Sequence, residues 1–384
     1  MNRVTLEPIT RRPAVLIAGL VVLTVLAFLG VSRLVHRFQE QEKAWARHLF
    51  ESGQAALLAG KPELALEELR AALTYNRDNF QYQLALARAL RDTGRTEESE
   101  TYLISLWERL PQDGAVNLAL GRLYARENSL DKAIQYYHNA IYGVWGADAD
   151  TRRRDAQLEL IEFLLRQNAV PQAQAELITL AASTPRNSEL QLQVARLYVR
   201  AQDYEHALAQ FQNVLGLDHG NAAALAGAGE AAFQLGRYRT AERYLQNAVR
   251  ANPQDAQAKQ LLETSNLILQ ADPFARRVPV AERNRRIWRA FDQAGKRLLG
   301  CAETKGIDLS PPSPSPGLPS LKAEWTAMKL RLAHLNAPRE AETPDAAMEL
   351  VFQIEQQTEA ICGPPNGLDL ALLLLSQDRA GAER

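Results

Sequence analysis

Small and large apolar residues recur through the middle of the chain at a fixed spacing. One set of small residues lies about 34 positions apart, except for one gap near 40: Ala65, Ser99, Ala133, Ala173, Ala207 and Ala241. A second set keeps the same register: Gly53, Ala87, Gly121, Ala195 and Gly229. Large apolar residues fill positions between them: Leu69, Leu103, Tyr137, Leu177, Phe211 and Leu245. This period predicts stacked pairs of α-helices.

The pattern resembles the tetratricopeptide repeat family over residues 46–255. The resemblance implies an all-α fold in which about six helix pairs form a right-handed superhelix. This chain departs from the family pattern in three ways. No unit has the tryptophan of the first helix, and Ile161 replaces a small residue in the fourth unit. The positions that hold proline in other units are occupied by Arg77, Trp145 and His219. The wider gap predicts an insertion near 148–153, which we expect to be a longer loop between the third and fourth repeats.

An uncharged run precedes the repeats. It extends from Ala14 to Ser32, and as a helix it would span about 29 Å, close to the thickness of the bilayer's hydrocarbon core. The run predicts a short tail at 1–12 and a transmembrane helix at 13–35. The alternative is a cleaved signal peptide with Gly30-Val31-Ser32 as the cleavage site. Positive charges flank both ends of the run, so they do not decide the orientation.

The pattern after the repeats predicts further helices. Residues 256–270 should form a helix that caps the repeat stack. Residues 280–384 should form a small C-terminal helical module, with helices near 280–299, 321–335 and 345–361. A Pro/Ser-rich linker is expected at 306–320. The last apolar run, Leu368 to Leu375, is too short to cross a bilayer and should pack on this module.

The only two cysteines, Cys301 and Cys362, both lie in the C-terminal module. A disulfide between them would suit an oxidising compartment such as a bacterial periplasm. Two buried thiols in a cytosolic protein are the alternative. No cluster of histidines and cysteines surrounds them, so the sequence predicts no metal site.

The first helix of each repeat lines the concave face in the family that the chain resembles. By this analogy, arginines recur along that face: Arg88, Arg91, Arg122, Arg126, Arg166, Arg196 and Arg200. Leucines lie between them at one equivalent position per unit: Leu84, Leu118, Leu158 and Leu192. Arginine pairs with carboxylates and leucine buries apolar side chains, so the pattern predicts a groove for acidic peptides. Alternatively, the arginines are ordinary solvated residues that pair along their own helices.

Composition and motifs limit the other classes of function. The formal net charge of −1 gives no overall basic field for binding nucleic acid. No nucleophile elbow, phosphate-binding loop or zinc-protease motif occurs in a fitting context, so we expect no catalytic residue, no cofactor and no small-molecule substrate.

The sequence therefore predicts a single-pass inner-membrane protein that presents its repeats outside the cytoplasm. Its expected function is that of a scaffold or adaptor for other envelope proteins. One alternative is a periplasmic chaperone or assembly factor for envelope complexes. Another is a redox-responsive regulator that works through Cys301 and Cys362.

Overall fold

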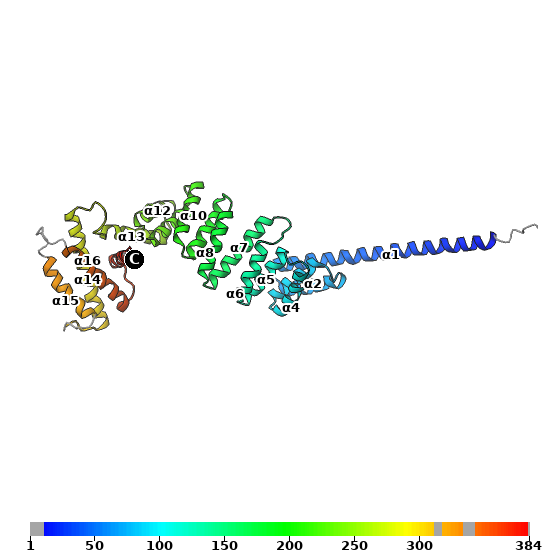
Figure 1. Ribbon diagram of the computed structural model, residues 1–384, viewed down its shortest axis with the longest axis horizontal. Helices are drawn as coiled ribbons and strands as arrows, with labels where there is room; N and C mark the ends of the chain where they lie inside the picture. Colours follow the sequence, from blue (N-terminus) through cyan, green and yellow to red (C-terminus); the bar gives the residue numbers. More distant parts are fainter. Residues whose placement is uncertain (1–10, 311–316, 333–341, 383–384) are drawn as a thin grey trace, which may run out of the picture. The chain divides into compact units, whose positions relative to one another are not determined.

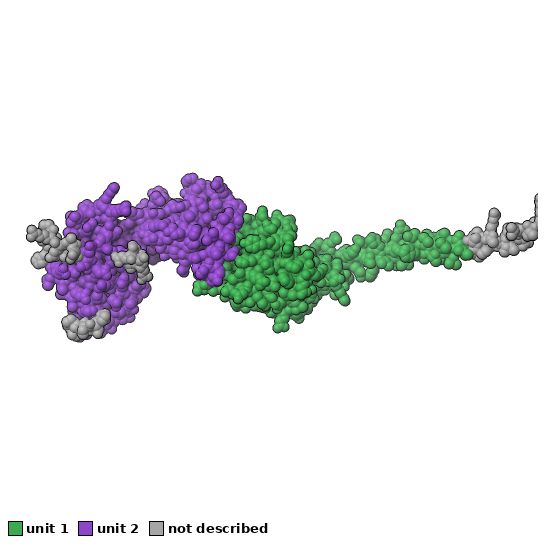
Figure 2. Space-filling view, viewed as in Figure 1, with its two compact units in different colours: residues 1–168 green, residues 169–384 purple. Residues whose placement is uncertain are grey.

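The computed structural model describes residues 11–310, 317–332 and 342–382 of this chain. These ranges contain seventeen α-helices and no β-strand, which confirms the all-α prediction. The chain divides into two compact units, residues 1–168 and residues 169–384 (Figure 2).

Helix α1 (Arg11–Leu58) is 48 residues long and runs without a break from the apolar segment into the first repeat (Figure 1). Its part from Ile17 onward is long and apolar enough to cross a membrane, and none of its apolar window is buried. The first buried side chain described on this helix is that of Ala46, which is 1% exposed. The predicted span at 13–35 and the predicted start of the repeats at 46 therefore lie on one helix.

Along the chain, the first helix of each repeat is followed by the second helix of the same repeat. The first unit contains α2 (Pro62–Tyr75), α3 (Phe80–Asp92), α4 (Thr96–Arg109), α5 (Gly114–Arg126), α6 (Leu130–Ile141) and α7 (Ala149–Arg166). The second unit continues with α8 (Val170–Ser183), α9 (Ser188–Arg200), α10 (Tyr204–Leu217), α11 (Ala222–Gln234) and α12 (Tyr238–Ala251). The six small residues that set the 34-residue period are all 0% exposed: Ala65, Ser99, Ala133, Ala173, Ala207 and Ala241.

Within a repeat, a small residue on the first helix faces a large residue on the second. A Cβ atom added to Gly53 would lie 2.7 Å from Cγ of Leu69, and one added to Gly229 would lie 2.6 Å from Cδ2 of Leu245. Contacts this short require the neighbour to move, so these glycines allow the paired helices to approach closely.

The turn between the two helices of each repeat also follows the period. One residue in each turn has a positive φ: Gly60, Gly94, Asn128, Asn168, Gln202 and Gly236. In five of these turns, all except that of Asn168, the next amide donates to a carbonyl near the end of the first helix, as in Arg95 N to Leu90 O at 2.8 Å. This left-handed cap ends the helix and satisfies its last carbonyls.

The predicted loop at 148–153 is wrong. Helix α7 begins at Ala149 and has 18 residues, against 13 in α5, so most of the inserted residues extend a helix. The connection that remains folds against the start of α5, where Val144 N donates to Gln112 O at 2.7 Å and Gly114 N donates to Val144 O at 2.9 Å. The ring of Trp145 covers Gly114, and its Nε1 donates to Ala140 O at 2.8 Å.

The C-terminal module contains α14 (Val280–Lys305), α15 (Leu318–Leu332), α16 (Glu342–Cys362) and α17 (Gly367–Ala382). It has one apolar core, in which the ring of Phe291 stacks on that of Trp325 at 5.5 Å between centroids. Because α15 begins at Leu318, the predicted linker 306–320 ends earlier than expected; its residues 311–316, and residues 333–335 of the predicted helix 321–335, lie outside the described residues.

Helix α13 (Ala256–Ala271) follows the last repeat and is itself covered by α17. Ile268 of α13 and Ala371 of α17 are 1% and 0% exposed and belong to one apolar cluster with Tyr238. The apolar run 368–375 therefore packs on α13 and through it on the last repeat. Helix α13 is an internal layer between the repeats and α17.

We expect Gly114→Ala to lower the free energy of unfolding by about 1–3 kcal/mol, because overpacking at a filled site costs this much. The added Cβ would lie 2.3 Å from Cε2 of Trp145 and would push the indole from its hydrogen bond with Ala140. Thermal unfolding of the full chain in detergent measures the change. Gly146→Ala is the matched control, because no atom lies within 4 Å of a Cβ there. Equal melting temperatures for the two variants would contradict this packing.

Candidate functional site

Arginines occupy the same place on three of the first helices. Arg88, Arg122 and Arg196 are each the ninth residue of their helix, on α3, α5 and α9. Arg126, Arg166 and Arg200 each end their helix. Arg88, Arg122, Arg126 and Arg166 belong to the first unit, and Arg196 and Arg200 to the second, so each group is described within its own unit.

Arg88 is half-buried among other positive charges. Its Nε is buried and has no hydrogen-bond partner. Burial, and then the charges of Arg122, Arg91 and Arg152, lower the pKa of Arg88 to about 10. A guanidinium under this repulsion is stabilised by a negative charge placed beside it. We call these four residues the arginine cluster.

Within the cluster, Arg91 on α3 lies beside a further arginine, Arg126 on α5. The guanidinium of Arg91 pairs with Asp92 at 2.8 Å, but its Nη1 is buried and has no hydrogen-bond partner. Nη1 of Arg126 donates to the carbonyl oxygen of Arg91 at 2.8 Å. The two helices thus hold their arginines side by side, with donor groups still unused.

Arg122 already has a partner inside the chain. Its guanidinium donates to both carboxylate oxygens of Glu159 on α7, with Nε to Oε2 at 2.7 Å. This hydrogen-bonded pair raises the pKa of Arg122 despite its partial burial. A ligand carboxylate would have to displace Glu159 to reach Arg122. The buried nitrogen atoms of the cluster that have no hydrogen-bond partner belong to Arg88 and Arg91.

The expected apolar anchors are partly absent. Leu84 and Leu118 are 3% and 7% exposed, so they pack inside the repeats and cannot serve as open contacts for a ligand. Leu158 and Leu192 are half-buried. The expectation of four equivalent groove leucines is wrong for the first two, because the slot lies closer to the helix-pair core than the resemblance implied.

The second unit has a different electrostatic character on its first helices. Arg196 and Arg200 are exposed on α9. On α11 the equivalent position holds Glu230, whose Oε1 accepts from Nε2 of Gln257 at 3.3 Å. Burial raises the pKa of Glu230. In the first unit, Arg166 is likewise exposed on α7, away from the repulsion that acts on Arg88.

Sequence reasoning missed Arg152 as part of the cluster. Arg152 and Arg153 fall in the segment 148–153 that was expected to be a loop, but both lie on α7 together with Arg154. The guanidinium of Arg152 lies 5.8 Å from the ring of Trp145, and its charge acts on Arg88. The signal that could have found it is the spacing of Arg152 and Glu159, which are seven residues apart and so share one helix face.

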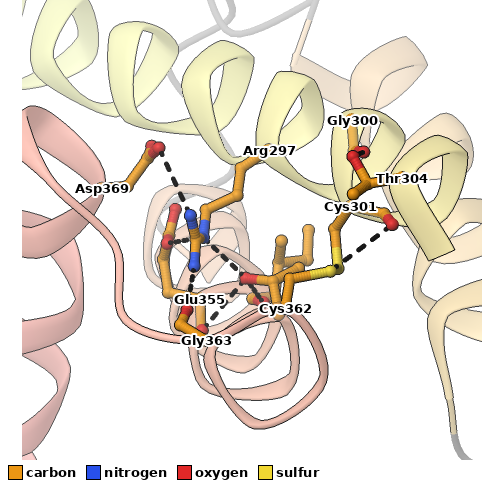
Figure 3. Close-up of a disulfide and its surroundings, with 10 residues drawn as sticks. Arg297, Gly300, Cys301, Thr304, Glu355, Cys362, Gly363 and Asp369 are labelled. Atoms are coloured by element: carbon orange, nitrogen blue, oxygen red, sulfur yellow. Dashed lines mark hydrogen bonds and ion pairs between the residues drawn. A yellow bond between two sulfur atoms is a disulfide. The ribbon is translucent and has the colours of Figure 1, made fainter.

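The structure joins Cys301 and Cys362 by a disulfide, with Cα atoms 5.9 Å apart (Figure 3). One turn before Cys301 on α14, Arg297 reaches across to α16: its Nε donates to Oγ1 of Thr358 at 2.9 Å, and its Nη2 donates to the carbonyl oxygen of Gly363 at 3.0 Å. The disulfide and Arg297 therefore tie the same two helices together.

Glu355 lies beside Arg297 and is 0% exposed. Its Oε2 is 3.2 Å from Nε of Arg297, yet neither carboxyl oxygen accepts a hydrogen bond from a described residue. Burial, and then the nearby charge of Asp369, raise the pKa of Glu355 to about 8, while Arg297 acts in the opposite direction. This is a buried acid whose charged form is poorly compensated.

Among the described residues, no group of three or more His, Cys, Asp and Glu side chains could hold a metal ion.

The tetratricopeptide repeat family profile matches residues 56–123 and 198–263. No curated protein sequence matches the chain. Solved structures with a similar fold include YrrB, a tetratricopeptide repeat protein with an unusual peptide-binding site, with 18% identity over 50% of this chain and 95% of that one, at a TM-score of 0.38. Another is pilF of Pseudomonas aeruginosa, with 16% identity over 58% and 96%, at 0.39. A third is PilW, a widely conserved type IV pilus biogenesis factor, with 18% identity over 56% and 98%, at 0.39. At these scores the likeness has no bearing on function.

We expect the melting temperature of the full chain in detergent to fall as pH rises from about 5 to about 8, partly because of Glu355. Its pKa is higher in the folded chain than its ordinary value of 4.5, so the folded state binds this proton more tightly, and the stabilisation is lost as pH rises through about 8. Glu355→Gln should make the decline shallower. Glu349→Gln, at an exposed position on the same helix, is the control. An unchanged slope in Glu355→Gln would contradict the assignment.

Proposed function

We propose a function for this chain from the premise that it belongs to the tetratricopeptide repeat family, whose profile matches residues 56–123 and 198–263. The protein is a membrane-anchored scaffold that binds acidic segments of partner proteins on the first-helix side of residues 80–166. A repeat stack buries surface only between neighbouring units and leaves an extended face for partners. The repeat family supports the scaffold function, and the long apolar part of α1 supports the membrane anchor.

The arginine cluster is the observation that carries the acidic specificity. Arg88 is repelled by three other guanidinium groups, and buried nitrogen atoms of Arg88 and Arg91 have no hydrogen-bond partner. Because these nitrogen atoms are buried, Arg88 and Arg91 have to turn outward to bind a carboxylate from a partner, which then relieves the repulsion and accepts their hydrogen bonds. Charge-assisted hydrogen bonds of this kind contribute about 1.5–3 kcal/mol each.

The proposed location is the inner membrane, with the repeats in the periplasm. The support for an oxidising compartment is the disulfide between Cys301 and Cys362, since structural disulfides are rare in the bacterial cytosol. The side of the membrane on which the repeats lie can be tested independently of binding, by labelling a cysteine introduced into the repeats with a reagent added outside the cell.

We expect an acidic Glu/Leu peptide of about twelve residues, labelled with a fluorophore, to bind the full-length protein in detergent more tightly than its Lys/Leu counterpart. Arg88→Gln with Arg91→Gln should weaken this binding about tenfold or more, the loss that follows from one charge-assisted hydrogen bond. Added salt should also weaken it. Fluorescence anisotropy measures the affinity.

The matched control is Arg70→Gln with Arg95→Gln, which removes the same charge from two arginines that pair with Glu98. The proposal fails if both double variants lose affinity equally, or if the basic peptide binds as tightly as the acidic one. Photo-crosslinking from position 126 in native membranes, followed by mass spectrometry, then identifies the partner. A small recurrent set of envelope proteins supports a scaffold, whereas many unrelated exported clients would indicate a chaperone.

A redox-responsive regulator is a second candidate, favoured by the position of the disulfide. Cys362 immediately precedes Gly363, whose carbonyl oxygen accepts from Arg297. Reduction should lower the stability of the C-terminal module by about 4 kcal/mol, as expected when a closed loop of some 60 residues is released. If the module regulates binding, peptide affinity should change as well. Unchanged affinity after complete reduction would leave the disulfide with a structural role alone.

A further inference from the structure

Helix α1 leaves its apolar segment and crosses about 20 Å before it meets the first repeat, taking the 13 residues from Arg33 to Trp45 at the usual rise per residue. Every side chain in this stretch is exposed except that of Glu42, which is half-buried. Continuity with the helix on both sides holds this stretch helical. Its exposed side chains are not buried against any other described helix of the chain.

Large apolar side chains follow one line along this stretch. Leu34, Phe38 and Trp45 are 70%, 60% and 61% exposed. With Val31 and Gln41 they form a series spaced by three and four residues in alternation, which we call the α1 stripe: Val31, Leu34, Phe38, Gln41 and Trp45. This 3.5-residue period is that of the seam between two helices in a coiled coil.

The α1 stripe lies on a different face from the contacts with the repeat. Ala46 and Phe50 point to the repeat, where Phe50 stacks on Tyr82 with 4.6 Å between ring centroids. An open hollow on the other face is lined by Gln41, Ala44, Trp45 and His48. Exposed aromatic groups of this size in line are typical of a surface that another molecule covers.

We propose that the α1 stripe packs against the same stripe of a second copy of this chain, as a parallel two-stranded coiled coil. The charged residues beside the α1 stripe favour a second copy of the chain as the partner. With Phe38 and Trp45 at the a positions of the heptad, Arg37 takes a g position and Glu42 an e position. In a parallel pair, a g residue of one helix meets the e residue five places further on in the other.

Arg37 and Glu42 are five residues apart, so two-fold symmetry forms two opposite-charge pairs across the seam. On one helix these two side chains point to different sides and do not meet. The other ion pair in this stretch, Lys43 with Glu40 at 3.5 Å, lies on the outer side of the proposed coil and leaves the seam free. A parallel pair also lets both apolar segments enter one bilayer from the same side.

Cysteine crosslinking of the full-length protein in membranes tests the pairing. Gln41→Cys and Leu34→Cys, both at d positions, should form disulfide-linked dimers under mild oxidation. Glu40→Cys and Lys43→Cys, on the outer side, are the matched controls. Dimers from both sets alike, or from neither, would overturn the proposal. Disulfide links from Gln41→Cys to another protein would also overturn it. Protection of Phe38→Cys from a water-soluble maleimide without any dimer would indicate lipid contact and would overturn it as well.

Charge reversal tests the predicted orientation. Arg37→Glu alone and Glu42→Arg alone should each reduce the yield of the Gln41→Cys dimer severalfold, because like charges then meet across the seam. The double swap should restore the yield to within about twofold of the starting protein. Arg47→Glu, which reverses a charge away from the e and g positions, should have no effect. Failure of the double swap to restore the dimer would overturn the parallel arrangement, whatever the result with acidic peptides.

Discussion

The close approach of two helices within each repeat is the constraint on which the rest of this structure depends. A glycine or alanine on the first helix faces a large side chain on the second, as Gly53 faces Leu69 and Gly229 faces Leu245. Because the helix axes can be brought together only where one partner is small, the constraint repeats with the period of the fold. It fixes which side of each first helix is buried, and hence which side can present arginines to a partner.

This dependence explains how far the sequence could predict the fold. Six small residues at one period, all fully buried in the structure, were sufficient to place the helix pairs. The segment at 148–153 was misassigned because a change of spacing does not say whether the extra residues lengthen a loop or a helix. Asp150 in the first turn of α7 favours the helix, since a negative charge there interacts well with the helix dipole.

The candidate site was less predictable, because its properties arise between helices. From their equivalent positions in the repeats, Arg88 and Arg122 were both expected to bind a ligand. In the structure Glu159, 37 residues beyond Arg122 in the chain, pairs with Arg122 and not with Arg88. Leu84 and Leu118 were expected to be open, and only packing reveals that they are buried. Likewise, the low exposure of Glu355 and its approach to Arg297 depend on a contact across 58 positions of the sequence, which no local pattern records.

The unbroken path of α1 has a mechanical consequence. From Ser32 to Ala46 the sequence contains no glycine and no proline, the residues at which helices most often bend. A rotation or tilt of the apolar segment would therefore rotate or tilt the first repeat by the same amount, because the helix between them has no residue at which it readily bends. Each residue added to this stretch would turn the arginine-bearing face by about 100° and move it by about 1.5 Å. The direction in which the first unit presents that face is thus set by the length of one helix.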